Sequence, residues 1–165
     1  MSVSDPRTSD RPVLPALPPH GQLRRLALTG TAGTVGRCRD HTRQALHDWG
    51  WLPTADPRQR ERADDVLLIV SELVTNACRH AGGPDQLVLH ARGSVLRIEV
   101  LDPLPTALQP RLPHRPGQPG GHGLHMVALL ASRWGHTLLT EPPGKSVWAE
   151  IDLPDGLDVS DPPDA

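Results

Sequence analysis

One stretch decides the fold of this chain: Ser71-Glu72-Leu73-Val74-Thr75-Asn76-Ala77-Cys78-Arg79-His80. Through it and just before it, apolar side chains recur every three to four residues, which is typical of the buried face of an amphipathic helix. Those side chains are Val66, Val70, Leu73 and Ala77. The spacing predicts a long helix over about residues 58–80, ended by Gly82-Gly83-Pro84.

Glu72 and Asn76 are four residues apart, so the helix places them one turn apart at the edge of its apolar face. The amide oxygen of Asn76 is a hard ligand suited to Mg²⁺, which prefers oxygen ligands and keeps several waters. The carboxylate of Glu72 is suited to accept a proton from a hydroxyl or from a metal-bound water. The alternative is an ordinary exposed Glu and a helical Asn without a site. The motifs that follow this helix in the sequence favour the site over this alternative.

Composition excludes several functional classes. At 165 residues the chain fits one domain with tails, and 17 basic against 19 acidic residues argue against a general polyanion binder. There is no Phe and no Tyr, so an aromatic platform for stacking single-stranded nucleic acid is not expected. We therefore expect no direct nucleic-acid partner, and we expect the four tryptophans to fill the core.

The two cysteines, Cys38 and Cys78, are forty residues apart, and their spacing suggests neither a metal site nor a redox motif. Two free thiols in a reducing cytosol are expected. No window approaches the length of a membrane span, and the N-terminus has no apolar core of a signal peptide. We therefore expect a cytoplasmic protein without a membrane partner.

The order of the segments predicts one domain over residues 21–154. Residues 1–20 are rich in Pro, Ser, Asp and Arg and are expected to be a disordered arm, and residues 155–165 a disordered acidic tail. Leu23, Leu26 and Leu28 indicate a short first strand, and a first helix is expected over about residues 35–49.

Two strands are expected next, over residues 86–92 and 95–102, joined at Gly93-Ser94. In the second strand, the period of two places Asp102 on the same face as Leu96, Ile98 and Val100. A carboxylate on a core-facing row is costly unless it receives hydrogen bonds, which suggests a binding pocket at the strand end. The alternative is that the strand stops there and Asp102 turns out into water.

A loop with six prolines, residues 103–119, then leads to Gly120-Gly121-His122-Gly123. Loops of this length in a compact domain are usually functional or mobile. A glycine cluster at a helix start lets backbone N–H groups approach a phosphate. The helix is expected to bury Leu124, Val127, Leu130, Ala131 and Trp134, with Gly135 closing it. Two last strands, about residues 136–141 and 146–153, are expected to flank a turn at 142–145.

Taken in order, these motifs resemble the ATP-binding domains of the gyrase/chaperone/histidine-kinase/mismatch-repair (GHKL) superfamily. Within it, the chain is most similar to the small anti-sigma-factor serine/threonine kinases. The resemblance covers about residues 23–153. Its motifs are Glu72–Ala77 followed by His80-Ala81, Asp102 at a strand end, Gly121-His122-Gly123-Leu124 and Gly144–Trp148. It implies an α/β fold of the Bergerat type, a two-layer sandwich of a mixed, mainly antiparallel sheet packed on helices, with ATP and Mg²⁺ as cofactors.

The resemblance also implies a role for each matching residue. Asn76 would coordinate Mg²⁺, Glu72 would be the general base, and Asp102 would accept a hydrogen bond from the adenine amino group. The remaining residues implied to contact the nucleotide are Arg79 and His80, then Gly121, His122, Gly123 and Leu124 around the phosphates, and Ser146 at adenine or a phosphate.

Two functions follow as hypotheses. In the first, the protein transfers the γ-phosphoryl of Mg-ATP to Ser or Thr of an antagonist (anti-anti-sigma) protein and sequesters a sigma factor, with a homodimer as one option for its assembly. In the second, it is a non-catalytic interaction module with weak or lost nucleotide binding. Pro103 and Pro105, which follow Asp102 where the superfamily usually has a glycine, favour the second. A plain ATPase gated by lid closure and dimerisation is a third class, against which the short chain counts.

Overall fold

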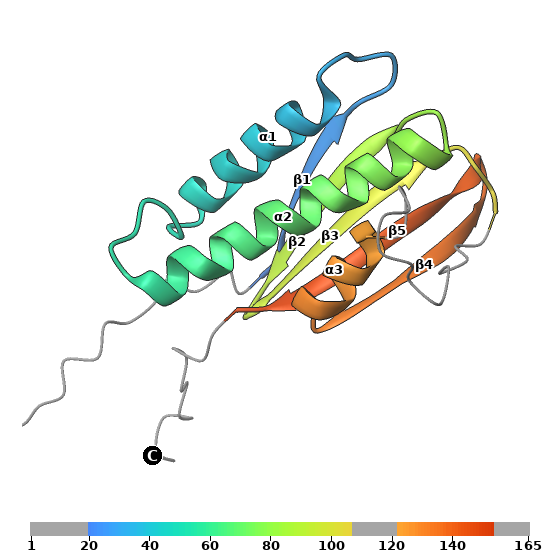
Figure 1. Cartoon of the computed structure of the whole chain (residues 1–165). Helices are drawn as coiled ribbons and strands as arrows, with labels where there is room; N and C mark the ends of the chain where they lie inside the picture. The colour runs from blue at the N-terminus through green and yellow to red at the C-terminus, as the bar shows by residue number, and fades with distance from the viewer. Residues whose placement is uncertain (1–19, 107–121, 154–165) are drawn as a thin grey trace, which may run out of the picture.

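The computed structural model describes residues 20–106 and 122–153, which form five strands and three helices. In chain order these are β1 (Gln22–Ala27), α1 (Thr34–Asp48), α2 (Pro57–His80), β2 (Gln86–Arg92), β3 (Val95–Asp102), α3 (His122–Leu130), β4 (Arg133–Thr140) and β5 (Pro143–Asp152). The strands form one sheet in the order β1-β2-β3-β5-β4. Figure 1 shows the helices together on one side of this sheet.

The predicted two-layer α/β sandwich is therefore confirmed. The sheet is antiparallel in each of the pairings between its described strands, whereas a mixed sheet was expected. The predicted arm and tail lie outside the described residues, apart from His20. Within residues 20–106 and 122–153, no helix combines the length and the apolar character that crossing a lipid bilayer requires.

Helix α2 is the centre of the helical layer, because it contacts α1 and α3 as well as strands β3 and β5. Asp56 caps its first turn, with Oδ1 accepting a hydrogen bond from the backbone N–H of Arg58 at 2.8 Å. Pro57 occupies the first helical position, where its missing N–H costs nothing. After His80, Gly82 adopts a positive φ of 71° that favours glycine and ends the helix, as predicted.

The core lies between α2 and the middle of the sheet. The predicted face of α2 is buried, and Leu96, Ile98 and Val100 of β3 meet it with no exposed surface. Trp49 and Trp51, which follow α1, are also buried there, as expected for core-filling tryptophans. The described members of the core are Leu28, Cys38, Ala45, Leu46, Trp49, Trp51, Ala63, Val66, Ile69, Val70, Leu73, Val74, Ala77, Leu87, Leu89, Ala91, Leu96, Ile98, Val100, Val127, Val147, Ala149, Ile151 and Leu153.

Two predicted boundaries in the C-terminal part were wrong. Helix α3 ends at Leu130 instead of running to Trp134, because the backbone N–H of Ser132 donates to the carbonyl oxygen of Glu150 at 2.8 Å and Arg133 already pairs in β4. Strand β5 begins at Pro143, three residues before the predicted start. Gly144 and Lys145, expected in a turn, therefore lie in β5, where both pair with β4 and Lys145 also pairs with Asp102 of β3.

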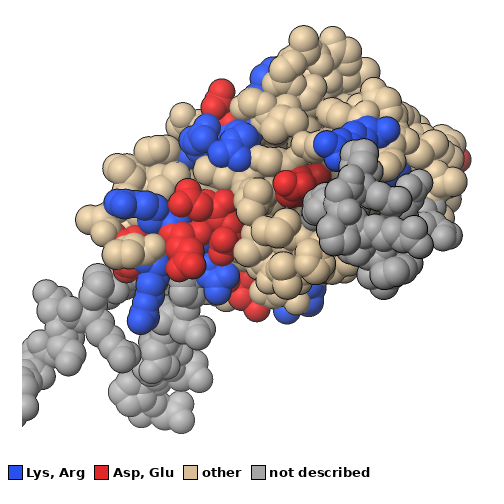
Figure 2. All heavy atoms as spheres, in the orientation of Figure 1, with Lys and Arg blue, Asp and Glu red and all other residues tan. Residues whose placement is uncertain are grey.

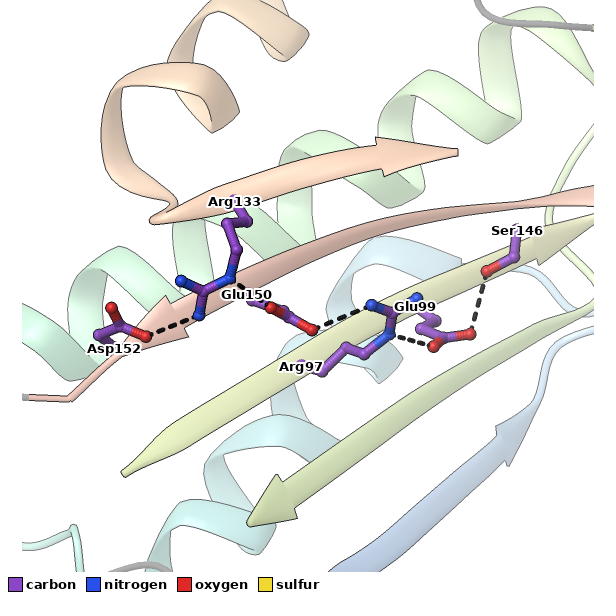
Figure 3. Close-up of polar contacts among 6 residues, drawn as sticks. All are labelled: Arg97, Glu99, Arg133, Ser146, Glu150 and Asp152. Carbon is purple, nitrogen blue, oxygen red and sulfur yellow. Dashed lines mark hydrogen bonds and ion pairs between the residues drawn. The ribbon is translucent and has the colours of Figure 1, made fainter. Parts of the chain in front are cut away.

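The face of the sheet away from the helices carries a ladder of alternating charges, shown in Figure 3. Arg97 forms an ion pair with Glu99 and a second one with Glu150 at 3.0 Å. Arg133 binds the other carboxylate oxygen of Glu150 at 2.7 Å and reaches Asp152 at 3.0 Å. These pairs satisfy the charges of the open face within the molecule.

Trp148 also lies on the open face, so the prediction that all four tryptophans fill the core was wrong for this one. It pairs with Glu99 in the β3–β5 ladder, and the guanidinium of Arg97 stacks over its ring at 4.2 Å from the centroid. The stack covers apolar ring surface that no helix covers on this side.

The helical face carries charges of both signs. Figure 2 shows acidic side chains bordered by basic ones over the N-terminal part of α2, without a continuous patch of one sign on the face that is drawn. Arg62 and Asp65 form one such pair in α2, at 3.5 Å.

Candidate functional site

The candidate site lies at one end of the molecule, where α2 ends and β3 ends. Five residues after α2, the backbone N–H of Asp85 donates to the carbonyl oxygen of Leu101 at 2.7 Å. This bond holds the start of β2 beside the end of β3, whose last residue is Asp102. The C-terminal turns of α2 and the end of β3 are therefore at the same end of the sandwich (Figure 1).

Glu72 and Asn76 are both half-buried on α2, as predicted for residues at the edge of the apolar face. Neither side chain makes a hydrogen bond or an ion pair with another residue of the described chain. A carboxylate and a carboxamide one turn apart, without internal partners, remain available to a ligand.

Ser71, which precedes Glu72, is by contrast fully used inside the fold. Its hydroxyl donates to the carbonyl oxygen of Leu67 at 2.8 Å and accepts a hydrogen bond from the guanidinium of Arg39 at 2.7 Å. Arg39 comes from α1, so this contact fixes α1 against the helix turn that carries Glu72. We assign Ser71 and Arg39 to positioning that turn.

Arg79 and His80 are exposed in the last turn of α2. Basic residues at this place also interact favourably with the negative end of the helix dipole, which is a structural role independent of any ligand. Their contact with a phosphate stays a prediction.

Asp102 faces the helical layer, as the alternation along β3 predicted. Its side chain is only 1% exposed, which excludes the alternative that it turns out into water. Oδ1 accepts two hydrogen bonds, from the backbone N–H of Leu104 at 2.9 Å and from Nζ of Lys145 at 3.0 Å. The buried carboxylate is thus compensated by a buried ammonium group.

Sequence reasoning missed Lys145, the only lysine of the chain. It pairs directly with Asp102 across the β3–β5 ladder, and its side chain is 3% exposed. Besides Asp102, its Nζ reaches the carbonyl oxygen of Leu104 at 3.3 Å. A signal was present, because the period of two that places Val147 and Ala149 in the core also places residue 145 on their side.

Gly144 lets β5 approach the end of β3. A Cβ atom on this glycine would lie 2.4 Å from the carbonyl oxygen of Asp102 and 3.3 Å from Cα of Pro103. Any other residue would therefore push apart the two strand ends that carry Asp102 and Lys145.

The structure does not bring Ser146 to this side of the sheet. Ser146 pairs with Leu101, and its hydroxyl donates to Glu99 at 3.0 Å on the open face (Figure 3). Because neighbouring residues of a strand point to opposite faces, Lys145 lies on the helical side of the sheet and Ser146 on the open side. The contact of Ser146 with adenine or a phosphate stays a prediction.

The glycine-rich turn is only partly described. Gly121 lies outside the described residues, and His122 and Gly123 begin α3, in which Leu124 is half-buried. Helix α3 packs on α2 and ends just before Arg133, which pairs with Glu150 near the far end of β5. The N-terminus of α3 is therefore directed toward the end of the molecule that carries Asp102, which is the direction that the phosphate-binding prediction requires.

The donor atoms at this end fit Mg²⁺ better than a transition metal. Within the described residues, no three or more His, Cys, Asp and Glu side chains gather into a metal-binding group. Asn76 would therefore supply one oxygen ligand, and phosphate oxygens and waters the others, which is how Mg²⁺ is usually held. Asp102 fits a donor on a purine only through Oδ2, or through displacement of Lys145 from Oδ1.

Comparison with known proteins identifies the family of the chain. Residues 36–151 match the model of one protein family, described as the histidine kinase-like ATPase domain. The matched region extends from α1 to β5 and contains each of the described candidate residues. A search of curated proteins found no match.

Proposed function

Since the chain belongs to the histidine kinase-like ATPase domain family, we propose that it is an ATP-binding regulatory protein of the anti-sigma-factor kinase type. It transfers the γ-phosphoryl group of Mg-ATP to a serine or threonine of a small antagonist protein. It also sequesters a sigma factor in the cytoplasm. This proposal joins the family to the residues at the end of α2.

One observation carries the proposal. Glu72 and Asn76 have no partners in the described chain, and the helix that carries them ends at the same end of the sandwich as the buried Asp102. The contact between Arg39 and Ser71 fixes the helix turn that carries Glu72. Groups placed by such a backbone suit phosphoryl transfer, because it depends on positioning and charge stabilisation.

Each residue then has one task. The amide oxygen of Asn76 holds the metal ion, and the carboxylate of Glu72 accepts the proton of the attacking hydroxyl. Asp102 binds the amino group of adenine, and the backbone at Gly121 to Leu124 approaches the phosphates. When bound, the metal ion neutralises charge on the phosphate oxygens.

Partners are proposed on the same basis. The hydroxyl from which Glu72 accepts a proton belongs to the antagonist protein, and the sigma factor binds the helical layer. The mixed charges on the helical layer (Figure 2) favour a protein partner of mixed charge over a polyanion. A homodimer is part of this proposal and is tested by sedimentation of the purified protein.

The test separates binding from transfer. In calorimetry with ATP and Mg²⁺, Asn76→Ala is expected to abolish Mg-dependent nucleotide binding. Glu72→Ala is expected to keep binding and to lose transfer of labelled phosphate to candidate antagonists. Glu61→Ala is the matched control, because Glu61 is an exposed acid at the other end of α2. Tight Mg-dependent ATP binding by Asn76→Ala would refute the metal site.

A second candidate function is a non-catalytic interaction module on the same fold. Two observations favour it: Oδ1 of Asp102 is already occupied by Lys145 and Leu104, and prolines stand at 103 and 105. A flat isotherm of the wild-type protein with ATP and Mg²⁺, together with a stable sigma-factor complex, would select this function over the first. A plain ATPase would instead release phosphate without any protein acceptor.

A further inference from the structure

The contact between Lys145 and Asp102 does more than stabilise the sheet. Nζ of Lys145 lies 3.0 Å from Oδ1 of Asp102, and the side chains of Lys145 and Asp102 are 3% and 1% exposed, so the pair is shielded from water. A buried ion pair is weak evidence for stability, since apolar replacements of similar volume often do as well. What it does fix is the orientation of the carboxylate, because the ammonium group lies on Oδ1.

We infer that Lys145 is a positioning residue that makes the purine site selective for adenine. Its ammonium group lies on Oδ1 of Asp102, at a place where an isolated carboxylate would be very costly. A carboxylate held in this way presents an acceptor, and no donor, to a base. The inference rests on the proposed nucleotide-binding function and adds the residue that decides which base is bound.

The geometry assigns the two oxygens of Asp102 to different tasks. Both hydrogen bonds from Lys145 and Leu104 end on Oδ1, which leaves Oδ2 as the acceptor for a base. The 6-amino group of adenine donates to such an oxygen. The 6-oxo group of hypoxanthine or guanine presents lone pairs instead, and an acceptor facing an acceptor loses the bond and leaves buried groups unpaired.

Lys145 is held in place independently of the base. Its Nζ has a second acceptor in the carbonyl oxygen of Leu104 at 3.3 Å. The backbone around the pair is closely packed, because Gly144 leaves no room for a Cβ atom beside Asp102. The ammonium group therefore stays on Oδ1, and the base takes Oδ2.

The test compares ATP with inosine triphosphate, which differs from it in carrying the 6-oxo group. We expect the wild-type protein to bind ATP at least about tenfold more tightly, since loss of one buried hydrogen bond has at least that effect. Lys145→Met removes the ammonium donor from Oδ1, so the buried carboxylate is no longer held with Oδ2 toward the base. The preference is then expected to fall below about threefold, and Lys145→Arg, which keeps the charge, is expected to retain it.

A merely structural role for Lys145 would weaken both nucleotides equally, and an unchanged ratio in Lys145→Met would overturn the inference. Tighter ATP binding by that variant would overturn it too, because Lys145 would then compete with the base.

If Lys145→Met does not fold, the double variant Asp102→Asn/Lys145→Met removes both charges and is expected to fold without adenine preference. A retained preference would again overturn the inference. A wild-type protein that binds neither nucleotide would refute the proposed function and the selectivity with it. Bound ATP with an unchanged ratio refutes the selectivity alone.

Discussion

Gly144→Ala is expected to destabilise the protein at the point where β5 meets the end of β3. The new Cβ atom would lie 2.4 Å from the carbonyl oxygen of Asp102, and real Cβ contacts are essentially never below 3.0 Å. The strand ends must therefore separate by at least the difference, 3.0 − 2.4 = 0.6 Å. Forcing an extra methyl group into a packed region costs about 1–3 kcal/mol, and backbone cannot yield as a flexible side chain does.

Gly36→Ala is the matched control for this prediction. Gly36 lies in α1, is exposed, and has nothing within 4 Å of the position where Cβ would stand. Alanine in a helix is favoured over glycine by about 0.5–1 kcal/mol, so the same substitution is expected to stabilise there. Urea unfolding, followed by tryptophan fluorescence, measures both variants against the wild type. Unfolding free energies of the two variants that agree within about 0.5 kcal/mol would contradict the close approach of the strands.

Three further predictions concern stability and reactivity. Asp56→Ala removes the N-terminal cap of α2 and is expected to cost about 1 kcal/mol in urea unfolding; no loss would mean that the cap bond is not formed in solution. Burial raises the pKa of Cys38 from 9.0 to about 11. Between these pH values the thiol of the unfolded chain loses its proton and that of the folded chain keeps it, so the free energy of unfolding is expected to fall as the pH rises from about 9 to about 11. Cys38→Ala should remove that fall, and a thiol reagent at pH 8 should label the exposed Cys78 first; equal labelling rates would contradict the burial of Cys38. The hydrogen bond from Arg133 lowers the pKa of Glu150 below its ordinary 4.5. The ionised Glu150 therefore contributes to the free energy of unfolding above pH 4.5, and this contribution is lost as the pH falls through the lowered value. Glu150→Gln should reduce the loss of unfolding free energy in acid by less than about 1 kcal/mol, measured by unfolding at a series of pH values.

Most of the fold could be predicted from periodicity, because the helical layer covers only one side of the sheet. The face of α2 and the inward row of β3 both show clean patterns, and the positions of Glu72, Asn76 and Asp102 followed from them. The boundary between α3 and β4 could not be predicted from periodicity. Leu130 and Trp134 fit a helix spacing, and only the pairing of Arg133 with Glu150 shows that the chain has already entered the sheet.

The part of the site on β5 could not be predicted for a related reason. Pro142-Pro143-Gly144-Lys145 has the composition of a turn, and local composition says nothing about where the pairing with β3 begins. The strand start at Pro143 brings Lys145 inside the ladder, on the inward face with Val147 and Ala149, whereas Ser146 points to the other face. Ion pairs between residues 43 positions apart depend on such a register, which single-sequence patterns do not contain.

The last strand of the described residues is an inner strand of the sheet, since β5 lies between β3 and β4. During synthesis on the ribosome, Glu72, Asn76 and Asp102 leave the exit tunnel well before Lys145 does. Until then, Asp102 has neither its counter-charge nor the neighbouring strand, and β3 has an unpaired edge. A nascent chain therefore cannot form the pair between Asp102 and Lys145 until nearly all of residues 20–153 have been made.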